Sequence, residues 1–397
     1  MSGINYLPED LDIKNKSIIV RLDLNVPIIN NKIQDFTRIL TSLPLLENLI
    51  KRKAKVIIIT HLGRPEGVKN KDLSLVPIYK FLKEKINTNI YFFMGNIDKE
   101  TKEKSSYLKS GEILLIDNIR FFKGESENDE SFAKILSSLG EIYINDAFSC
   151  SHRKQASIHK ITKYINKCYG GPLLKNELKA INLVIKDKKI PVTCIIGGSK
   201  ISTKINVISN LISNVNNIVI VGAMANNFLA FKGLEVGKSL IEKNSNMIIE
   251  RIYSEAKKKN CKIIIPLDCS VSTNLEGDSF SKKNADKINK NELILDIGPK
   301  TIKEIEEIID KSNTVLWNGP AGYFENRKFA LGTNSIANKI SENTINNSLI
   351  SILGGGDTLS AINKIERKLK FTHLSTAGGA FLEYLEGKDL PGLSVLK

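Results

Sequence analysis

Short apolar runs recur along the chain, separated by longer stretches in which apolar residues keep a helical spacing. Runs that are apolar on both faces are typical of strands buried inside a parallel sheet. They occupy residues 17–20, 56–60, 113–116, 142–145, 191–196, 218–221, 262–265, 314–317 and 348–353. Stretches 36–53, 202–213, 300–311 and 357–370 predict amphipathic helices. This alternation predicts an α/β protein with doubly wound, mainly parallel sheets.

The length and the distribution of motifs predict two domains. A chain of 397 residues is too long to fold around a single hydrophobic core of ordinary size. Arginine, histidine and asparagine clusters come before about residue 169, whereas glycine-rich turns follow residue 191. Gly170, Gly171 and Pro172 precede a helical pattern over 173–186. We therefore expect a first domain over residues 1–172, a helical hinge over 173–190 and a second domain over 191–380.

Arginine is scarce, and its placement is informative. Only nine of the 58 basic residues are arginine, and Arg21, Arg38, Arg64, Arg120 and Arg153 lie within the first 153 residues, mostly in dense polar clusters. A guanidinium is a planar fork that can hold two oxygens of a phosphate or carboxylate. For any single arginine a structural salt bridge is the alternative. Together they predict a pocket for a small polyanion. In contrast, Arg52, on the polar side of the helix predicted over 36–53, is expected to be replaceable by lysine.

Charge and cysteine content exclude several classes of protein. The formal charge of +15 comes from lysines spread along the whole chain. We find no arginine-rich arm, no zinc-ligand spacing and no basic–aromatic RNA motif, so no nucleic-acid partner is expected. Five cysteines without a C-x-x-C pair predict reduced thiols and a cytoplasmic location. No apolar run is long enough to cross a membrane, and the acidic first twelve residues predict no targeting segment.

The end of the first predicted strand carries polar side chains. With a period of two, Arg21, Asp23 and Asn25 point to one face, and ligands of α/β proteins bind at the carboxyl ends of parallel strands. A buried structural ion pair is the alternative reading. His61 and His152 are the histidines favoured as pocket residues, because each lies near an arginine of the clusters. No Ser-His-Asp triad and no histidine metal site is expected.

Glycine loops follow the later strands. In the segment 197–204, Lys200 and Lys204 are four residues apart and are expected on one face of a helix start. Free N–H groups at a helix start attract phosphate, and two lysines there are unfavourable without an anionic partner.

The segment 354–358 repeats the strand–glycine–helix design. Its Asp357 either caps the helix or serves Mg²⁺. Loops 318–325 and 375–380 add backbone near a ligand, and Glu325 suits ribose hydroxyls. Segment 233–239 resembles a phosphate-binding loop, but it has three residues between its glycines where four are required, so we interpret it as a surface turn.

Taken in order, these motifs resemble those of the phosphoglycerate kinase family over essentially the whole chain. The matching segments are 21–27, 60–65, 117–121, 146–148, 152–153, 197–204, 224–226, 318–325, 354–358 and 385–392. The resemblance implies two Rossmann-like domains joined by a hinge, with the C-terminal tail 381–397 packed on the first domain. It implies a monomeric, cytoplasmic glycolytic enzyme that exchanges a phosphoryl group between 1,3-bisphosphoglycerate and ADP, giving 3-phosphoglycerate and ATP, with Mg²⁺.

The resemblance also implies the site residues. Those for phosphoglycerate are Asp23, Asn25, Arg38, His61, Arg64, Arg120 and Arg153. Those for the nucleotide are Lys204, Asn318, Glu325, Gly355, Gly356, Asp357 and Thr358, with Asp357 meeting the metal. Arg38, Lys200 and Lys204 are implied to be catalytic.

Three features depart from the family pattern, and two alternatives stay open. Ala377 stands where glycine is usual, the segment 221–223 has fewer glycines, and Asn227 is unusual in its place. The alternatives are a different two-domain carboxylate kinase, of the acetate or aspartate type, and a basic protein that binds nucleic acid without turnover.

Overall fold

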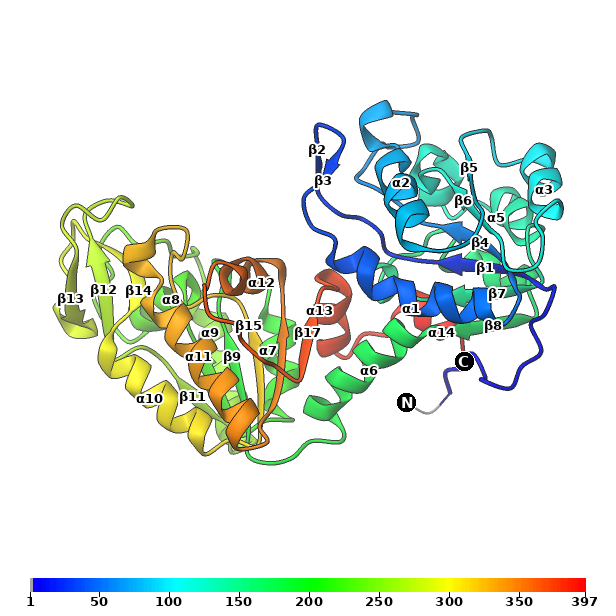
Figure 1. Cartoon of the computed structure of the whole chain (residues 1–397). Coiled ribbons are helices and arrows are strands. Elements are labelled where there is room, and N and C mark those ends of the chain that lie inside the picture. Colours follow the sequence, from blue (N-terminus) through cyan, green and yellow to red (C-terminus); the bar gives the residue numbers. More distant parts are fainter. Residues whose placement is uncertain (1–2) are drawn as a thin grey trace. The chain divides into compact units, whose positions relative to one another are not determined.

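The structure, a computed structural model, describes residues 3–397 and divides into two compact units (Figure 1). The first unit comprises the chain up to Lys179 together with Asp389–Lys397, and the second comprises Ala180–Lys388. The division falls inside helix α6 (Pro172–Ile185), within the segment expected to be the connector. Residues 381–388, which were expected with the C-terminal tail, group with the second unit.

The first unit is built on a six-stranded parallel sheet in the order β5-β6-β4-β1-β7-β8. Both faces of the sheet are buried, as Ile18 and Ile19 of β1 show, which explains why the strands read as continuous apolar runs. The strands are β1 (Ser17–Arg21), β4 (Lys55–Ile59), β5 (Ile90–Phe93), β6 (Ile113–Ile116), β7 (Ile142–Asn145) and β8 (Lys167–Gly170), with a small hairpin of β2 (Ile28–Ile29) and β3 (Lys32–Ile33). The helices are α1 (Thr37–Lys51), α2 (Val76–Lys85), α3 (Lys99–Ser106), α4 (Lys123–Ser126) and α5 (Glu130–Ser137).

Residues 389–397 complete the first unit. Helix α14 (Pro391–Ser394) lies against the end of β7, where the Gly392 N–H donates to the Ser151 carbonyl at 2.8 Å and the Asn145 amide donates to the Gly392 carbonyl at 3.3 Å. At the other end of the chain, the Asn5 N–H donates to the Leu396 carbonyl at 2.8 Å. The buried apolar side chains of this tail are Leu390, Leu393 and Leu396. The first unit is therefore discontinuous in sequence.

The second unit is built on another six-stranded parallel sheet, in the order β11-β10-β9-β15-β16-β17. Counted along the chain within this sheet, the order is 3-2-1-4-5-6, the doubly wound order of dinucleotide-binding folds. The strands are β9 (Val192–Ile196), β10 (Asn217–Ile220), β11 (Lys262–Ile264), β15 (Thr314–Asn318), β16 (Ile350–Gly354) and β17 (His373–Ser375). The helices are α7 (Ile205–Ile212), α8 (Ala223–Phe231), α9 (Asn246–Lys258), α10 (Pro299–Asp310), α11 (Leu331–Asn346), α12 (Gly356–Asn363) and α13 (Gly379–Leu385).

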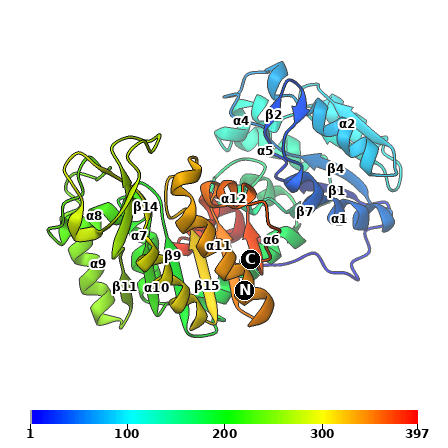
Figure 2. The same cartoon turned by 60° about the vertical axis from the view of Figure 1, so that its left-hand side comes forward.

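Helices pack around this sheet in two groups. Helix α7 contacts α9 and α13, whereas α10 and α11 lie side by side and α11 contacts α12 (Figure 2). Right-handed crossovers place helices on opposite faces of a sheet when the strand order reverses direction, as it does here between β9 and β15. Among the described residues, no helix combines the length and the apolar character that a bilayer-spanning segment needs.

Several elements differ from the sequence predictions. Helix α7 starts at Ile205, three residues later than predicted, and α12 ends at Asn363, well before residue 370. Beyond α12, Ile365 and Leu369 pack against the core from an irregular segment, so their apolar spacing was misleading. A three-stranded antiparallel sheet of β13 (Ser281–Asn284), β12 (Asp268–Ser272) and β14 (Leu293–Ile297) was not predicted.

Candidate functional site

In the first unit, the predicted site residues follow the carboxyl ends of the central strands. Asp23 and Asn25 come after β1, His61 and Arg64 after β4, Arg120 after β6, and Arg153 after β7. Arg38 is in the first turn of α1. Because the carboxyl ends of parallel strands meet at one edge, a single edge of the sheet carries the whole set.

Asp23 and Asn25 organise this edge. An Arg38 Nη1 donates to Asp23 Oδ2 at 2.7 Å and to the Asn25 carbonyl at 3.1 Å, and Ser149 Oγ also donates to Asp23 Oδ2. The Asn25 side chain accepts the Gly63 N–H at 2.9 Å, which links the segment after β1 to the segment after β4. Burial opposes ionisation of Asp23, but its basic neighbours and Ser149 outweigh burial and lower the pKa of this carboxyl.

The remaining arginines are held to different degrees. Arg120 is almost fully buried and donates to the Gly63 carbonyl at 2.7 Å, and burial lowers the pKa of its guanidinium to about 10. Arg153 donates to His152 Nε2 at 3.1 Å, and its charge acts on both His61 and Arg120. Arg64 is exposed, and its guanidinium has no hydrogen-bond or ion-pair partner among residues 3–397. Its fork is therefore available to a ligand.

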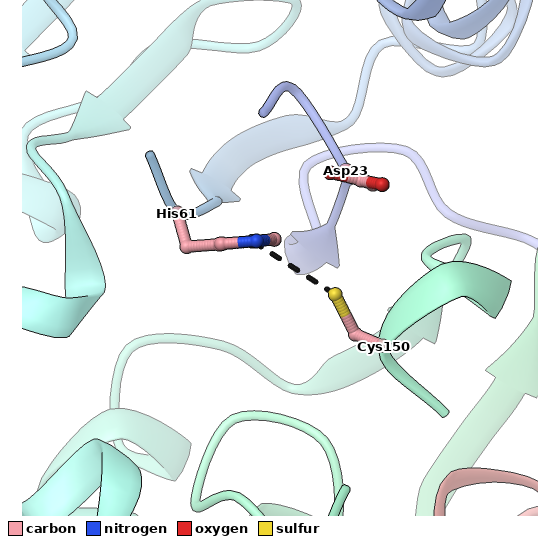
Figure 3. A group of neighbouring side chains, drawn as sticks. All are labelled: Asp23, His61 and Cys150. Atoms are coloured by element: carbon pink, nitrogen blue, oxygen red, sulfur yellow. Dashed lines mark hydrogen bonds between the residues drawn. The ribbon is translucent and has the colours of Figure 1, made fainter. Parts of the chain in front are cut away.

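The structure adds two residues, Ser149 and Cys150, to which no pattern in the sequence pointed. They lie in a short 3-10 helix, Phe148–Cys150, directly after β7. Figure 3 shows Cys150 beside His61 and Asp23; the three could offer ligand atoms to a metal, all within 4.8 Å of one another. No histidine metal site was expected from the sequence, because these three residues are far apart along the chain and form no spacing motif. Whether the cluster suits a metal depends on Arg21.

In the second unit, the site lies between the ends of β9 and β15. Lys204 Nζ donates to the Gly197 carbonyl at 2.5 Å and to Asn318 Oδ1 at 2.7 Å. Burial lowers the pKa of the Lys204 ammonium to about 8, and the charge of Asp357 partly opposes this. Lys204 is thus a partly buried cation that donates to two neutral residues, Gly197 and Asn318.

The expectation that Lys200 and Lys204 share a helical face is wrong. Gly198 has a φ of +122° and the chain stays irregular through Thr203, so Lys204 is the residue that precedes α7. Lys200 is exposed on this loop, which we call the 198–204 loop. The two ammonium groups therefore have different environments.

Two glycines allow the strand ends to approach closely. A Cβ at Gly319, which has a φ of +103°, would lie 2.5 Å from the Gly197 carbonyl carbon, and a Cβ at Gly197 would lie 2.3 Å from the Pro320 carbonyl oxygen. The Thr358 hydroxyl accepts the Gly319 N–H at 2.7 Å and donates to the Gly354 carbonyl at 3.0 Å. Only glycine fits where two backbones are this close.

A cavity of about 380 Å³ opens beside these loops. Its lining includes Gly198, Gly222, Leu229, Leu240, Pro320, Glu325 and Asp357. The volume and the mixed apolar and backbone lining suit a nucleoside. Asp357 is exposed in the first turn of α12, and a single carboxylate of this kind fits Mg²⁺, which binds through one or two carboxylates and substrate phosphates. Gly355 and Gly356 precede it with no side chain to block the approach of a phosphate.

Two contacts fasten the 198–204 loop, one from Met224 of α8 and one from Glu242 beyond that helix. The Met224 N–H donates to the Gly198 carbonyl at 2.7 Å. The Glu242 carboxylate accepts both the Ser202 N–H at 2.9 Å and the Ser202 hydroxyl at 2.5 Å. Glu242 is in turn held by Asn227, whose Oδ1 accepts the Glu242 N–H at 2.8 Å. Asn227, which departs from the family pattern, therefore helps to hold Glu242 in place. No pattern in the sequence pointed to Glu242.

The chain is similar to known proteins over nearly its whole length. A sequence profile described as "Phosphoglycerate kinase" matches residues 8–388. Phosphoglycerate kinases of Wolbachia pipientis wMel and Dictyoglomus turgidum are each 42% identical, over 390 and 389 residues, covering 98% of this chain and 98% and 97% of theirs. A solved structure of phosphoglycerate kinase from Coxiella burnetii superposes with a TM-score of 0.90 at 37% identity, covering 98% of this chain and 97% of that chain. The chain belongs to the phosphoglycerate kinase family.

Proposed function

We propose that this chain transfers a phosphoryl group reversibly between 1,3-bisphosphoglycerate and ADP, giving 3-phosphoglycerate and ATP, which is the ATP-forming glycolytic reaction of its family. One observation carries the proposal: two parallel sheets each carry groups that suit an anion at their carboxyl edge, and the two sets have different chemistry. One is rich in arginine, and the other combines glycine backbone with a partly buried lysine.

The arginine site is assigned to phosphoglycerate. We assign its binding to Asp23, Asn25, Arg38, His61, Arg64, Arg120 and Arg153. Exposed Arg64 offers a free fork to a phosphate, since no described residue occupies it. Asp23 holds Arg38 at 2.7 Å, which supports a role in orienting this guanidinium.

The glycine site is assigned to the nucleotide. We assign its binding to Lys204, Asn318, Glu325, Gly355, Gly356, Asp357 and Thr358. Asn318 and Thr358 each bond to the Gly354 carbonyl, so they support this role by shaping the backbone that would meet phosphate. Asp357 would hold Mg²⁺, and the bound ion would supply neutralisation of phosphate charge.

The chemistry needs no nucleophile or base from the protein, because a β-phosphate oxygen of ADP attacks the acyl phosphate. The bond from phosphorus to the carboxylate oxygen breaks as the new phosphorus–oxygen bond forms. Catalysis then consists of positioning and charge neutralisation, which we assign to Arg38, Lys200 and Lys204. Because an acyl phosphate loses its group to water, we further propose that the two units close on each other when both ligands are bound.

Purified protein tests the proposal directly. We expect ATP consumption that depends on both 3-phosphoglycerate and Mg²⁺ in a coupled assay. Turnover with acetate or aspartate in place of phosphoglycerate would favour the other carboxylate kinases. Salt-sensitive retention on DNA without any turnover would favour the binding protein. Protein that binds both ligands yet shows no turnover with Mg²⁺ would refute the catalytic assignment.

Closure, oligomeric state and location need separate tests. Small-angle scattering is expected to give a smaller radius of gyration with phosphoglycerate and a nucleotide analogue together than with either alone. Sedimentation is expected to show a monomer. A cytoplasmic location agrees with five free cysteines, none of them in a disulfide among the described residues.

A further inference from the structure

Arg21, the last residue of β1, is fully buried beneath the arginine site. Its Nε donates to Ser157 Oγ at 2.9 Å, and one terminal nitrogen donates to the Leu22 carbonyl at 2.5 Å. The other terminal nitrogen lies 3.3 Å from His61 Nδ1 and 3.9 Å from Cys150 Sγ. With no exposed surface, Arg21 cannot contact a ligand directly, so any effect on binding has to act through a neighbour.

A buried network supports this guanidinium. The Ser157 hydroxyl accepts from Arg21 and donates to Glu125 Oε1 at 2.7 Å, and the Ser157 N–H donates to Glu125 Oε2 at 2.8 Å. Glu125 has no exposed surface either. A buried arginine is costly unless it is hydrogen-bonded and matched by a carboxylate, and this network supplies both. The network fixes the direction in which Arg21 presents its N–H groups.

That direction determines the state of His61. A guanidinium has donors and no acceptor, so the His61 Nδ1 that faces Arg21 must present its lone pair. A neutral imidazole carries one proton, which therefore lies on Nε2. No described residue forms a hydrogen bond with Nε2, so that N–H is available to a ligand.

We propose that Arg21 is a positioning residue that holds His61 in the neutral Nε2–H tautomer, so that His61 acts as a fixed hydrogen-bond donor to an anionic oxygen of the phosphorylated carboxylic acid. The identity of this ligand rests on the proposed function, whereas the tautomer does not. A neutral donor with one defined N–H adds direction to a site in which the other donors are flexible cations.

The surroundings of His61 agree with a neutral ring. Burial lowers the pKa of His61 well below its ordinary value, with Arg21 as the next cause, and only Asp23 opposes them. The charged groups that act on the ring are Arg21, Asp23, Arg120 and Arg153. Cys150 Sγ, 3.8 Å from Nδ1, adds a thiol on the same side.

The same geometry argues against a metal at the Asp23, His61 and Cys150 cluster (Figure 3). A metal would need the Nδ1 lone pair that already faces Arg21. Asp23 is already bound to Arg38, and burial raises the pKa of the Cys150 thiol. The cluster is therefore the floor of an anion site.

Nitrogen NMR of ¹⁵N-histidine-labelled, ligand-free protein tests the tautomer. We expect His61 to show a protonated Nε2 and an unprotonated Nδ1, unchanged from about pH 8 to about pH 5.5. Arg21→Met is expected to allow ring titration within this range. Ser157→Ala, which keeps Arg21 but loosens it, provides the test if Arg21→Met fails to fold. Arg64→Met removes a nearby charge that has no contact with Nδ1 and is expected to leave the His61 signals unchanged. A proton on Nδ1, or titration of the parent ring near its ordinary pKa, would overturn the proposal.

Kinetics test the donor role. Arg21→Met is expected to raise the KM for 3-phosphoglycerate by about tenfold, the effect of losing one hydrogen bond to a charged group, with the KM for ATP unchanged. The expected NMR signals together with an unchanged KM for 3-phosphoglycerate would overturn the donor role. A parent protein without any phosphoglycerate turnover would defeat the proposed function, and the NMR result would still decide the tautomer.

Discussion

In the first unit the proposed anion site is made mainly of side chains, whereas in the second it is made mainly of backbone. Both lie at the carboxyl edge of a six-stranded parallel sheet, so the scaffold does not explain the difference. The first site concentrates guanidinium groups and supports them with acidic residues such as Asp23 and the buried Glu125. The second relies on close strand ends at Gly197 and Gly319 and on a partly buried cation, Lys204.

The difference has a physical consequence. Guanidinium forks recognise a small, highly charged ligand through the positions of a few side chains, and each fork can be removed by mutation. A backbone site leaves room for a larger ligand that brings its own cation. Such a site is most sensitive to substitution at glycines where a Cβ has no space. The two sites should therefore fail in different ways.

The largest effect is expected from Arg38→Lys, which keeps the charge but removes the fork. The Arg38 guanidinium bonds to Asp23 and to the Asn25 carbonyl from one terminal nitrogen, and a lysine ammonium cannot reproduce this geometry while also meeting a phosphate. We expect kcat/KM to fall by roughly 2–4 kcal/mol of transition-state stabilisation. Steady-state kinetics with both substrates gives the value.

The control for this variant has to be chosen with care. Arg52, which was expected to be replaceable by lysine, is a poor control because its guanidinium donates to the Leu11 carbonyl at 2.5 Å. Arg251→Lys is the better control, since Arg251 is exposed on α9 and its one ion-pair partner within residues 3–397 is Glu255, at 2.7 Å. Activity of Arg38→Lys within twofold of the parent would place Arg38 outside the reacting centre.

Gly319→Ala should damage the backbone site through stability. The new Cβ would collide with Gly197, and the residue would keep a left-handed φ, so the strand ends have to separate. We expect a loss of roughly 1–3 kcal/mol in the free energy of unfolding. The single tryptophan, Trp317, is buried in β15 and donates to the Gly319 carbonyl at 2.7 Å, so its fluorescence follows the unfolding of this unit.

Gly356→Ala is the matched control, because a Cβ there has open space at the start of α12. Replacing glycine by alanine in a helix with compatible φ stabilises by about 0.4–1 kcal/mol. Equal melting of the two alanine variants would show that close strand approach is not what requires glycine at position 319.

An intermediate effect is expected on proton uptake by Lys204, which is partly buried. With a Lys204 pKa of about 8, roughly half of the ligand-free molecules carry a neutral amine at pH 8. Bound phosphates favour the ammonium, so nucleotide binding at about pH 8 is expected to take up roughly half a proton, and almost none near about pH 6.5. Calorimetry in buffers of different ionisation enthalpy measures this uptake.

The lowered Lys204 pKa also makes the free energy of unfolding depend on pH. The folded pKa of about 8 lies below the ordinary 10.5, so the unfolded chain holds the extra proton between these values. The free energy of unfolding therefore increases as pH rises from about 8. Lys204→Arg stays charged and should abolish both effects. Proton uptake that persists in Lys204→Arg would have to come from another group.

The smallest effect is expected at Glu242, which fastens the 198–204 loop. Glu242→Gln replaces a carboxylate that accepts two hydrogen bonds from Ser202 with a weaker acceptor. We expect the Ser202 amide to exchange its hydrogen about 2–10 times faster, corresponding to about 0.5–1.5 kcal/mol. Glu250→Gln, exposed on α9, is the matched control. Unchanged exchange would mean that the Met224 contact alone holds the loop.

The sequence predicted the central strands of the two six-stranded sheets because strands with two buried faces are apolar throughout. It missed β13, Ser-Lys-Lys-Asn, because this edge strand shows no such pattern, and it missed β17 because three residues carry too little signal. It placed the start of α7 too early because helical spacing in a sequence does not reveal that Gly198 has a left-handed φ.

Within the site, the residues that could be proposed are those that the family motifs contain. Their partners Ser149, Ser157, Glu125 and Glu242 are distant in sequence from what they hold, by 32 residues between Ser157 and Glu125 and by 40 between Glu242 and Ser202. Such pairs follow from strand order and loop packing, which a single sequence does not encode locally. The family resemblance proposed the residues that bind the substrates, and the structure shows which side chains contact those residues.

The place of residues 389–397 in the first unit has a consequence for synthesis on the ribosome. The first unit lacks α14 and its three leucines until the whole of residues 180–388 has been made. At about 5–20 residues per second, that interval lasts on the order of 10–40 s. During this interval the Asn5 N–H and the Asn145 amide lack their partners in this tail, and the surface that will cover its three leucines stays open. The second unit, although translated later, can complete its fold first.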